Sequence, residues 1–189
     1  EKKKHKNYLI FKNNKPILFA CSRAVEEKGV GLIIRALSNL KKKNREEILN
    51  FLYLGDGKDL KKWKILSKNS DLKNIKFLGE LPFKEMIKYY DQCYFFILPS
   101  YYSEETFGRS WIEAMARNKP IISTNIENLK HLIIDGINGF QVDPTVESVE
   151  NAINRALSLS NEDYEIMCKN AKDFSMKFKQ SNIVKYLLK

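Results

Sequence analysis

The sequence lacks any stretch near the roughly 20 consecutive apolar residues that a membrane-spanning helix needs. Its first six residues, Glu1–Lys6, are almost all charged and contain no apolar core of the kind that a secretory signal peptide carries. The chain also does not begin with methionine. From these absences we expect a cytoplasmic domain that is a fragment of a longer protein.

Cysteine and histidine are scarce. Cys21 and Cys93 lie in or beside apolar runs, where a free thiol behaves as a small hydrophobe, and Cys168 is far from both. An odd number of cysteines at such wide spacing predicts reduced thiols in the cytoplasm. No group of cysteine and histidine residues has the spacing of metal ligands, so we expect no metal site.

The chain carries 33 Lys and Arg against 23 Asp and Glu, a formal net charge of +10. One interpretation is an anionic partner, such as nucleic acid, the inner face of the cell membrane in peripheral contact, or a phosphorylated substrate. The other is a lysine-rich surface with no specific role. Few lysines alternate with aromatic residues as they do in a nucleic-acid platform, so we expect no nucleic-acid partner.

Short, nearly continuous apolar runs recur along the chain, as is typical of parallel strands that are buried on both faces. The runs are Pro16–Ser22, Ile48–Leu54, Ile75–Leu78, Tyr94–Leu98 and Pro120–Thr124, with a short sixth candidate at Phe140–Val142.

Between these runs, apolar residues recur at helical spacing. They do so over residues 30–40, 83–90 and 149–157, and again from Tyr164 to Leu187. This alternation predicts an α/β fold, a Rossmann-like doubly wound parallel sheet of about six strands with C-terminal helices. We expect residues 1–14 to be a basic tail or linker and residues 15–189 to form this one domain.

In such a sheet, ligands bind beyond the carboxyl ends of the strands. The segment after the first run contains Arg23 and Lys28, and two cations at this place suit a diphosphate. Alternatively, they are surface cations paired with Glu26 and Glu27. Position alone does not decide between these interpretations.

Glycines follow the second and third runs. Gly55 and Gly57 permit a tight turn or the close approach of the backbone to a ligand. Leu78 and Gly79 could offer backbone groups to a nucleobase. A plain turn explains either segment equally well.

The segment after the fourth run leads into a helix that we expect to begin near Phe107 or Gly108. Its free N–H groups at residues 106–109 form an anion site. Glu105 and Glu113 are eight positions apart, a rise of roughly 12 Å along a helix. Carboxylates accept hydrogen bonds from vicinal sugar hydroxyls, so this helix end could hold sugar, phosphate and ribose. Otherwise Glu105 favours the helix dipole and Glu113 is an ordinary exposed residue.

Residues 104–144 resemble the signature of the family 4 retaining glycosyltransferases, which have the two-domain GT-B fold. The matching motifs are Glu105-Thr106-Phe107-Gly108, Glu113-Ala114-Met115, Lys119-Pro120-Ile121-Ile122 and Asp135-Gly136-Ile137-Asn138-Gly139-Phe140. Upstream, Arg23 with Glu27-Lys28-Gly29, then Gly55-Asp56-Gly57 and Phe77-Leu78-Gly79, follow in the family's order.

The resemblance implies a role for each motif residue. Arg23 and Lys28 would neutralise the diphosphate, and Glu105 would hold the donor sugar, which makes these three the catalytic candidates. Glu113 would hold the ribose hydroxyls. The other donor-binding candidates are Thr106, Phe107, Gly108, Gly55, Gly57, Leu78 and Gly79. Metal-dependent glycosyltransferases usually carry an Asp-x-Asp triplet, which this sequence lacks, so we expect no cofactor beyond the nucleotide-sugar substrate.

The resemblance also implies a missing N-terminal domain that binds the acceptor. We therefore expect the chain to fold, to bind a nucleoside diphosphate sugar weakly and to transfer little sugar alone. The complete enzyme would move a hexose-type sugar to a glycan or lipid-linked acceptor in polysaccharide biosynthesis. Two alternatives stay open: another GT-B enzyme, such as a sugar-nucleotide epimerase or a phosphorylase, and a non-enzymatic basic α/β module that binds an anionic partner.

Overall fold

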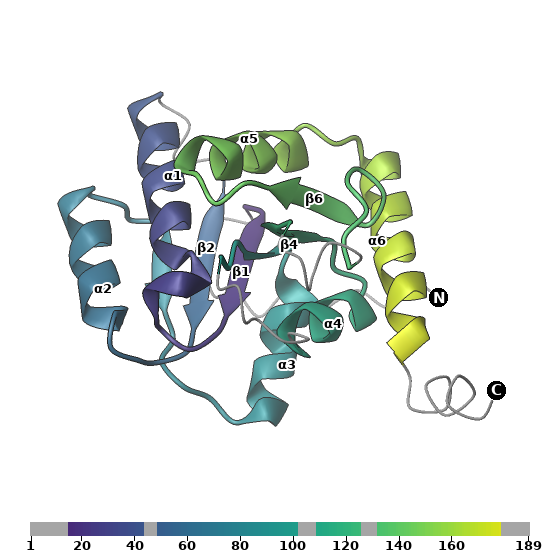
Figure 1. Ribbon diagram of the computed structural model, residues 1–189, viewed down its shortest axis with the longest axis horizontal. Coiled ribbons are helices and arrows are strands. Elements are labelled where there is room, and N and C mark those ends of the chain that lie inside the picture. Colours follow the sequence, from purple (N-terminus) through teal and green to yellow (C-terminus); the bar gives the residue numbers. More distant parts are fainter. Residues whose placement is uncertain (1–14, 44–48, 102–108, 126–131, 179–189) are drawn as a thin grey trace.

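Six apolar segments form one parallel sheet in the computed structural model, which describes residues 15–43, 49–101, 109–125 and 132–178 (Figure 1). The strand order is β3-β2-β1-β4-β5-β6. The strands are β1 (Ile17–Cys21), β2 (Asn50–Leu54), β3 (Ile75–Phe77), β4 (Phe95–Leu98), β5 (Ile121–Thr124) and β6 (Gly139–Val142). Every pairing is parallel, so the predicted fold class is confirmed.

The strand order reverses between β1 and β4. Leu18 of β1 pairs with Phe51 of β2 on one side and with Phe95 of β4 on the other. The chain passes from β3 back to β4 through a helix, so the loops that follow β1 and β4 leave the sheet in opposite directions. In doubly wound sheets such a reversal marks the crevice at the carboxyl ends of the two strands, where ligands bind.

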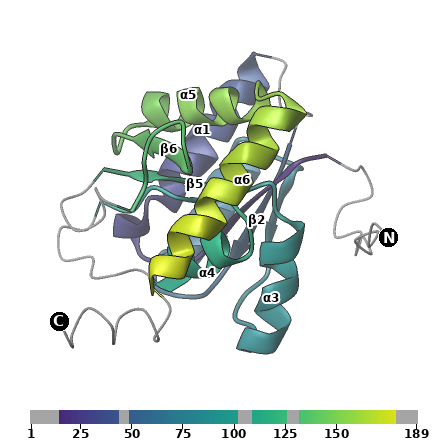
Figure 2. The same cartoon turned by 90° about the vertical axis from the view of Figure 1, so that its right-hand side faces the viewer.

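Helices cover both faces of the sheet (Figures 1 and 2). Helix α1 contacts α2 and α5, and α4 contacts α6. The helices are α1 (Val30–Lys42), α2 (Leu60–Asn69), α3 (Phe83–Gln92), α4 (Arg109–Ala116), α5 (Val146–Leu157) and α6 (Asn161–Ser175), with short 3-10 helices η1 (Glu26–Lys28) and η3 (Met176–Phe178). None of the helices in the described ranges is long and apolar enough to cross a bilayer.

Two features of the helices differ from the sequence prediction. Helix α2 was not predicted, because only Trp63 and Ser67 of its residues are buried and lysines surround them. Trp63 anchors the helix by meeting the Tyr53 ring edge-on at 5.3 Å between centroids. Phe83, placed in the apolar stripe of α3, is 58% exposed because that helix buries its later residues Tyr89 and Tyr90.

The core is rich in aromatic rings where α3 meets the sheet. Phe19 of β1 packs edge-on against Tyr90 at 5.1 Å, stacks on Tyr89 at 6.1 Å and meets Phe96 of β4 at 5.9 Å. These contacts, with that of Cys21 at the end of β1 to Met86 at 3.3 Å, hold α3 against β1. All three cysteines are free thiols, as predicted.

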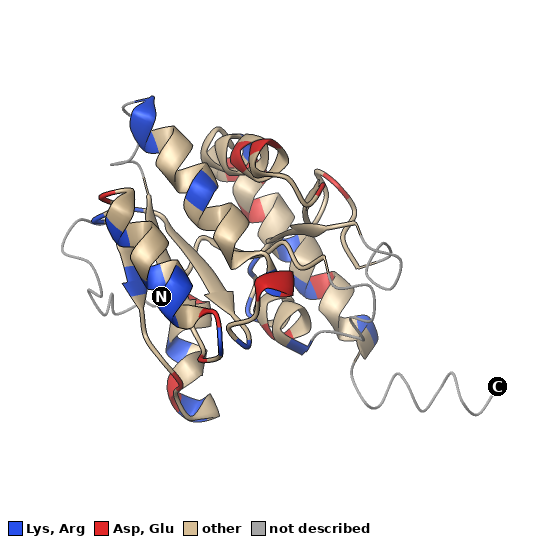
Figure 3. Cartoon of the chain, turned by 60° about the vertical axis from the view of Figure 1, so that its left-hand side comes forward, with Lys and Arg blue, Asp and Glu red and all other residues tan. Residues whose placement is uncertain are grey.

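Basic residues are spread over several elements of the molecule (Figure 3). Several of them pair with acidic residues on neighbouring elements, as Lys41 does with Asp71 at 2.8 Å and Arg155 with Asp135 at 2.9 Å. Some of the basic residues therefore serve ion pairs within the chain, and the surplus itself lies elsewhere.

Candidate functional site

Three loops at the carboxyl edge of the sheet are tied together through their backbones. They follow β1, β2 and β3, in that order. The Ala24 N–H donates to the Asp56 carbonyl at 2.7 Å, and the Gly55 N–H donates to the Gly79 carbonyl at 2.7 Å. The structure thus brings the predicted segments after the first three strands into direct contact.

The glycines after β2 are required by this contact. A Cβ atom on Gly55 would lie 1.9 Å from the Ser22 carbonyl oxygen, and one on Gly57 would lie 2.6 Å from the Ala24 oxygen. Both have positive φ, 139° and 151°. Packing between the loops therefore accounts for both glycines, and their contact with a ligand stays a prediction. Gly79, with φ 72°, has open space where its Cβ would lie.

The turn that carries Lys28 is seated against the end of β4. Gly29 has φ 71°, and a Cβ on it would lie 2.0 Å from the Pro99 carbonyl oxygen. The Glu27 carbonyl accepts hydrogen bonds from the Tyr101 N–H at 2.9 Å and from Ser100 Oγ at 3.1 Å. The loops on the two sides of the crevice are therefore joined through η1.

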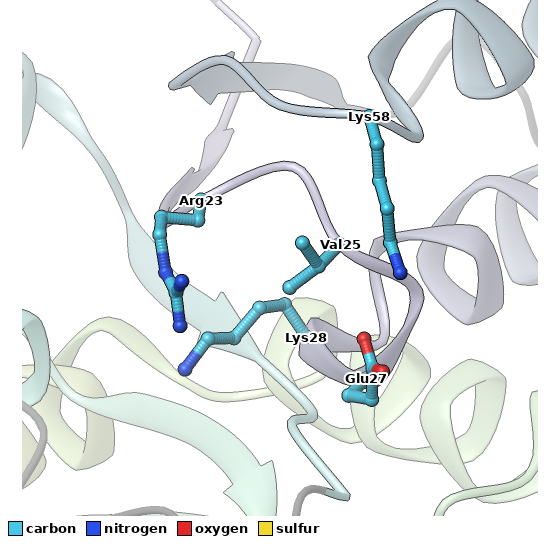
Figure 4. A pocket seen from close by; sticks show the side chains of 5 residues that line it. All are labelled: Arg23, Val25, Glu27, Lys28 and Lys58. Atoms are coloured by element: carbon cyan, nitrogen blue, oxygen red, sulfur yellow. The ribbon is translucent and has the colours of Figure 1, made fainter.

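A pocket of about 180 Å³ opens between the β1 and β2 loops, lined by Arg23, Val25, Glu27, Lys28 and Lys58 (Figure 4). The head groups of Arg23 and Lys28 turn toward the same side of the pocket, and Lys58 enters from the β2 loop. The two predicted cations are thus neighbours. Sequence reasoning missed Lys58, although its place directly after Gly57 at a strand end was a usable signal.

The two acidic residues near this pocket, Glu26 and Glu27, differ in their partners. Glu26 is engaged elsewhere, because its carboxylate pairs with Lys62 at 2.8 Å and its N–H donates to Asp59 at 2.8 Å. The buried Oε2 atom of Glu27 has no hydrogen-bond partner within the described part of the chain. Three cations against one carboxylate leave the pocket positively charged, which suits an anion with more than one charge.

Glu113 lies on α4 beside the carboxyl end of β1. Its Oε2 atom accepts a hydrogen bond from the Tyr90 hydroxyl at 3.0 Å. Burial raises the pKa of Tyr90 far above its ordinary value, with smaller contributions from Cys21 and Glu113, so this hydroxyl stays protonated and donates. Burial and the Glu113 charge also raise the pKa of Cys21 to about 12. The interpretation of Glu113 as an ordinary exposed residue is therefore wrong.

Part of the predicted site falls outside the described residues. Glu105, Thr106, Phe107 and Gly108 belong to this part, as does the expected start of the helix, which is described from Arg109 onward. The described residues that line the pocket do not include Glu113. Within the four described ranges, no group of three His, Cys, Asp or Glu residues could hold a metal ion.

Comparisons with known proteins agree with this architecture. Residues 1–174 match the model of the family "Glycosyl transferases group 1". An uncharacterized glycosyltransferase of Methanocaldococcus jannaschii, MJ1178, is 31% identical over 156 residues, which are 82% of this chain and 41% of that protein.

Solved structures share the fold. A glycosyltransferase from Rickettsia africae ESF-5 superposes with a TM-score of 0.81 and 27% identity, over 93% of this chain and 46% of its own. Anabaena Alr3699/HepE, solved in complex with UDP-glucose, gives a TM-score of 0.79 and 23% identity over 93% and 49%.

The chain spans less than half the length of each of these relatives. Its sheet accounts for one Rossmann-like half of the predicted GT-B architecture. On the family match and the fold together, this chain belongs to the group 1 glycosyl transferases.

Proposed function

We propose that this chain is the donor-binding domain of a family 4 retaining glycosyltransferase. The complete enzyme would transfer a hexose-type sugar from a nucleoside diphosphate sugar to a glycan or lipid-linked acceptor. The observation that carries the proposal is the basic pocket at the carboxyl edge of the sheet, formed by Arg23, Lys28 and Lys58. It lies where doubly wound sheets bind nucleotides.

The size and charge of the pocket suit a diphosphate. Its volume of about 180 Å³ is below the ~300–1,000 Å³ of most small-molecule sites, so it takes one part of a larger ligand. A guanidinium and two ammonium groups can donate charge-assisted hydrogen bonds to phosphate oxygens. UDP-glucose, bound by the Anabaena protein of the same fold, makes uridine nucleotides the first probe to try.

The nucleoside and the sugar would extend from this pocket along the crevice. Glu113, beside the end of β1, would accept hydrogen bonds from the ribose hydroxyls. The open side of Gly79 leaves room for a base against the backbone of Leu78 and Gly79. Glu105, with the backbone of residues 106–108, would hold the donor sugar, as the resemblance implies.

Catalysis would depend on the leaving group. As the bond to the anomeric carbon breaks, negative charge gathers on the diphosphate, and Arg23, Lys28 and Lys58 would stabilise it without a metal ion. The sugar passes through an oxocarbenium-like state, and the acceptor hydroxyl attacks from the face that the diphosphate leaves and gives its proton to the departing phosphate oxygen. This course retains the configuration at the anomeric carbon.

The acceptor would come from a second, N-terminal domain. The relatives are more than twice as long as the matched region, which leaves room for such a domain in the full enzyme. We propose that residues 15–189 alone bind the donor and transfer little sugar. The enzyme would work in the cytoplasm, in peripheral contact with the anionic inner face of the cell membrane.

Titration calorimetry of this chain with UDP, GDP and ADP tests the proposal. We expect one of the three to bind, and its affinity to fall with rising salt because the contact is with cations. Absence of binding to all three nucleotides and to their sugar conjugates would refute donor binding. The anomeric configuration of the product of the full-length enzyme, read by NMR, tests retention, and an inverted product would exclude it.

A further inference from the structure

The hydroxyl of Tyr90 connects two helices at the crevice. Tyr90 belongs to α3 and donates its hydrogen bond to Glu113 of α4, 23 positions further along the chain. The hydroxyl is the one polar atom of the Tyr90 side chain, and it donates its proton to a single carboxylate oxygen.

The Tyr90 ring is held firmly. Its residue is 1% exposed, and the ring lies edge-on to Phe19 at 5.1 Å and tilted against Phe96 at 5.6 Å. Both partners belong to central strands of the sheet. A ring fixed between β1 and β4 leaves its hydroxyl at one position, so the donor that Glu113 meets is preorganised.

A hydrogen bond at one carboxylate oxygen changes what the other can do. A free glutamate side chain samples many rotamers, and fixing it in a complex costs conformational entropy. With Oε2 held by Tyr90, the plane of the Glu113 carboxylate is set before a ligand arrives. A neutral hydroxyl also leaves the charge of the carboxylate intact, whereas a lysine or arginine partner would compete with ligand hydroxyls for it.

The Tyr90–Glu113 pair lies beside the end of β1, the strand that leads into the basic pocket. Cys21, whose thiol interacts with both Tyr90 and Glu113, ends β1 two positions before Arg23 of the basic pocket. The Cys21 thiol also contacts the Met86 sulfur at 3.3 Å, so the pair rests on apolar side chains. In a nucleoside diphosphate the ribose directly follows the phosphates, and Cys21 is the residue that links the Glu113 carboxylate to the loop carrying Arg23.

We propose that Tyr90 is a positioning residue, which orients the Glu113 carboxylate to accept both vicinal hydroxyls of the donor's ribose. The inference rests on the proposed function and adds a residue to it. The consequence is a preference for ribose. The site distinguishes a ribonucleotide from its 2′-deoxy counterpart through the Tyr90 hydroxyl, which does not contact the ligand.

The test compares UDP with 2′-deoxy-UDP by calorimetry, or the guanine or adenine pair where that base binds more tightly. Four proteins are measured: the unchanged chain, Tyr90→Phe, Glu113→Gln and Tyr89→Phe. The last is a matched control, because Tyr89 is the adjacent tyrosine of the same helix and stacks on the same Phe19 ring. Thermal unfolding of each protein shows that it is folded.

We expect the unchanged chain to prefer the ribonucleotide about tenfold, the worth of one good hydrogen bond to a charged group. Tyr90→Phe should lower this preference by about threefold or more, since its carboxylate is no longer oriented. Glu113→Gln should lower it further, and Tyr89→Phe should leave it unchanged. A structural role alone would move the unfolding temperature but not the preference.

Contrary results separate the two proposals. If the unchanged chain binds no nucleotide, donor binding fails and the role of Tyr90 fails with it. If it binds but Tyr90→Phe keeps the full preference for the ribonucleotide, or the unchanged chain has none, the positioning inference fails while donor binding stands.

Discussion

The two sides of the crevice are built in different ways. On the side of β1, β2 and β3, the loops are joined backbone to backbone, and two glycines allow a contact that no larger residue could make. On the side of α4, the one described hydrogen bond to the Glu113 side chain comes from the Tyr90 hydroxyl. The first side is determined by the course of the chain and the second by a side chain.

This difference separates stability from recognition. Where the backbone sets the geometry, the exposed cation Arg23 can change without disturbing the loops, whereas an added methyl group at a glycine cannot be accommodated. Where the Tyr90 hydroxyl sets the geometry, a single oxygen atom determines the orientation of the Glu113 carboxylate. We therefore expect substitutions in the loops after β1, β2 and β3 either to destabilise the fold strongly or to leave its stability unchanged. Substitutions beside α4 should instead alter the preference between nucleotides.

The largest effect should come from Gly55→Ala. The new Cβ would lie 1.9 Å from the Ser22 carbonyl oxygen, so the loops must separate. We expect the free energy of unfolding to fall by more than about 3 kcal/mol, from strain and lost packing together. Urea denaturation followed by circular dichroism measures it.

Gly136→Ala is the matched control for this change. Gly136 also has a positive φ, 73°, but a Cβ there meets nothing within 4 Å. Gly136→Ala should lower the free energy of unfolding by about 1 kcal/mol, which is only the conformational strain of a left-handed residue. Equal losses for the two variants would show that the loops after β1 and β2 do not depend on their close approach.

Arg23→Ala should have the next largest effect, on binding rather than on folding. Removing one cation from the pocket should weaken nucleoside diphosphate binding about tenfold to a hundredfold, as expected for a charge-assisted hydrogen bond worth ~1.5–3 kcal/mol. Unfolding should change little, because Arg23 is exposed. Calorimetry at two salt concentrations measures the affinity and its electrostatic part.

Lys61→Ala controls for net charge. Lys61 is an exposed cation on α2 and does not line the pocket. Its removal subtracts the same unit of charge from the protein as Arg23→Ala does. If the two variants lose affinity equally, the nucleotide responds to total charge and the pocket is not its site.

Tyr53→Phe tests the backbone-built side with the same chemical change as Tyr90→Phe. The Tyr53 hydroxyl is buried and donates to the Ser22 carbonyl at 2.8 Å. Its loss should lower the free energy of unfolding by about 1 kcal/mol, since the Ser22 carbonyl loses a hydrogen-bond partner. The preference for ribonucleotide over 2′-deoxynucleotide should not move. A changed preference would mean that the two sides are coupled.

The sequence was sufficient to predict the sheet. Runs such as Phe95–Leu98 are short and apolar at every position, as expected of a strand buried on both faces. Helix α2 was missed because its apolar face is narrow: Trp63 is its one buried apolar residue, and Leu60 and Leu66 are only partly buried among lysines. Periodicity detects a wide apolar face more readily than a narrow one.

The candidate site was predicted unevenly for a related reason. The position of Arg23 and Lys28 after a strand left two interpretations open, and their match to the family's order of motifs made them candidates. Lys58 was not predicted, because the glycines before it accounted for the segment either as a plain turn or as a close approach to a ligand. Tyr90 was assigned to the core, which is correct for its ring, and nothing in the local sequence connects its hydroxyl with Glu113. A contact between side chains that lie far apart in the chain cannot be inferred from the local sequence, and it is revealed only by the fold.

The smallest effect should come from Asp91→Asn, which breaks a second link between the same two helices. Asp91, next to Tyr90, pairs with Arg117 just beyond α4, and both side chains are substantially exposed, 38% and 44%. Such a pair contributes about 0.5 kcal/mol or less, and salt screens it. The unfolding temperature should fall slightly at low salt and match the unchanged chain at high salt, with the ribonucleotide preference intact. Should that preference drop as it does in Tyr90→Phe, the tilt of α4 as a whole would orient Glu113, and the hydroxyl would be only one of several ties that maintain it.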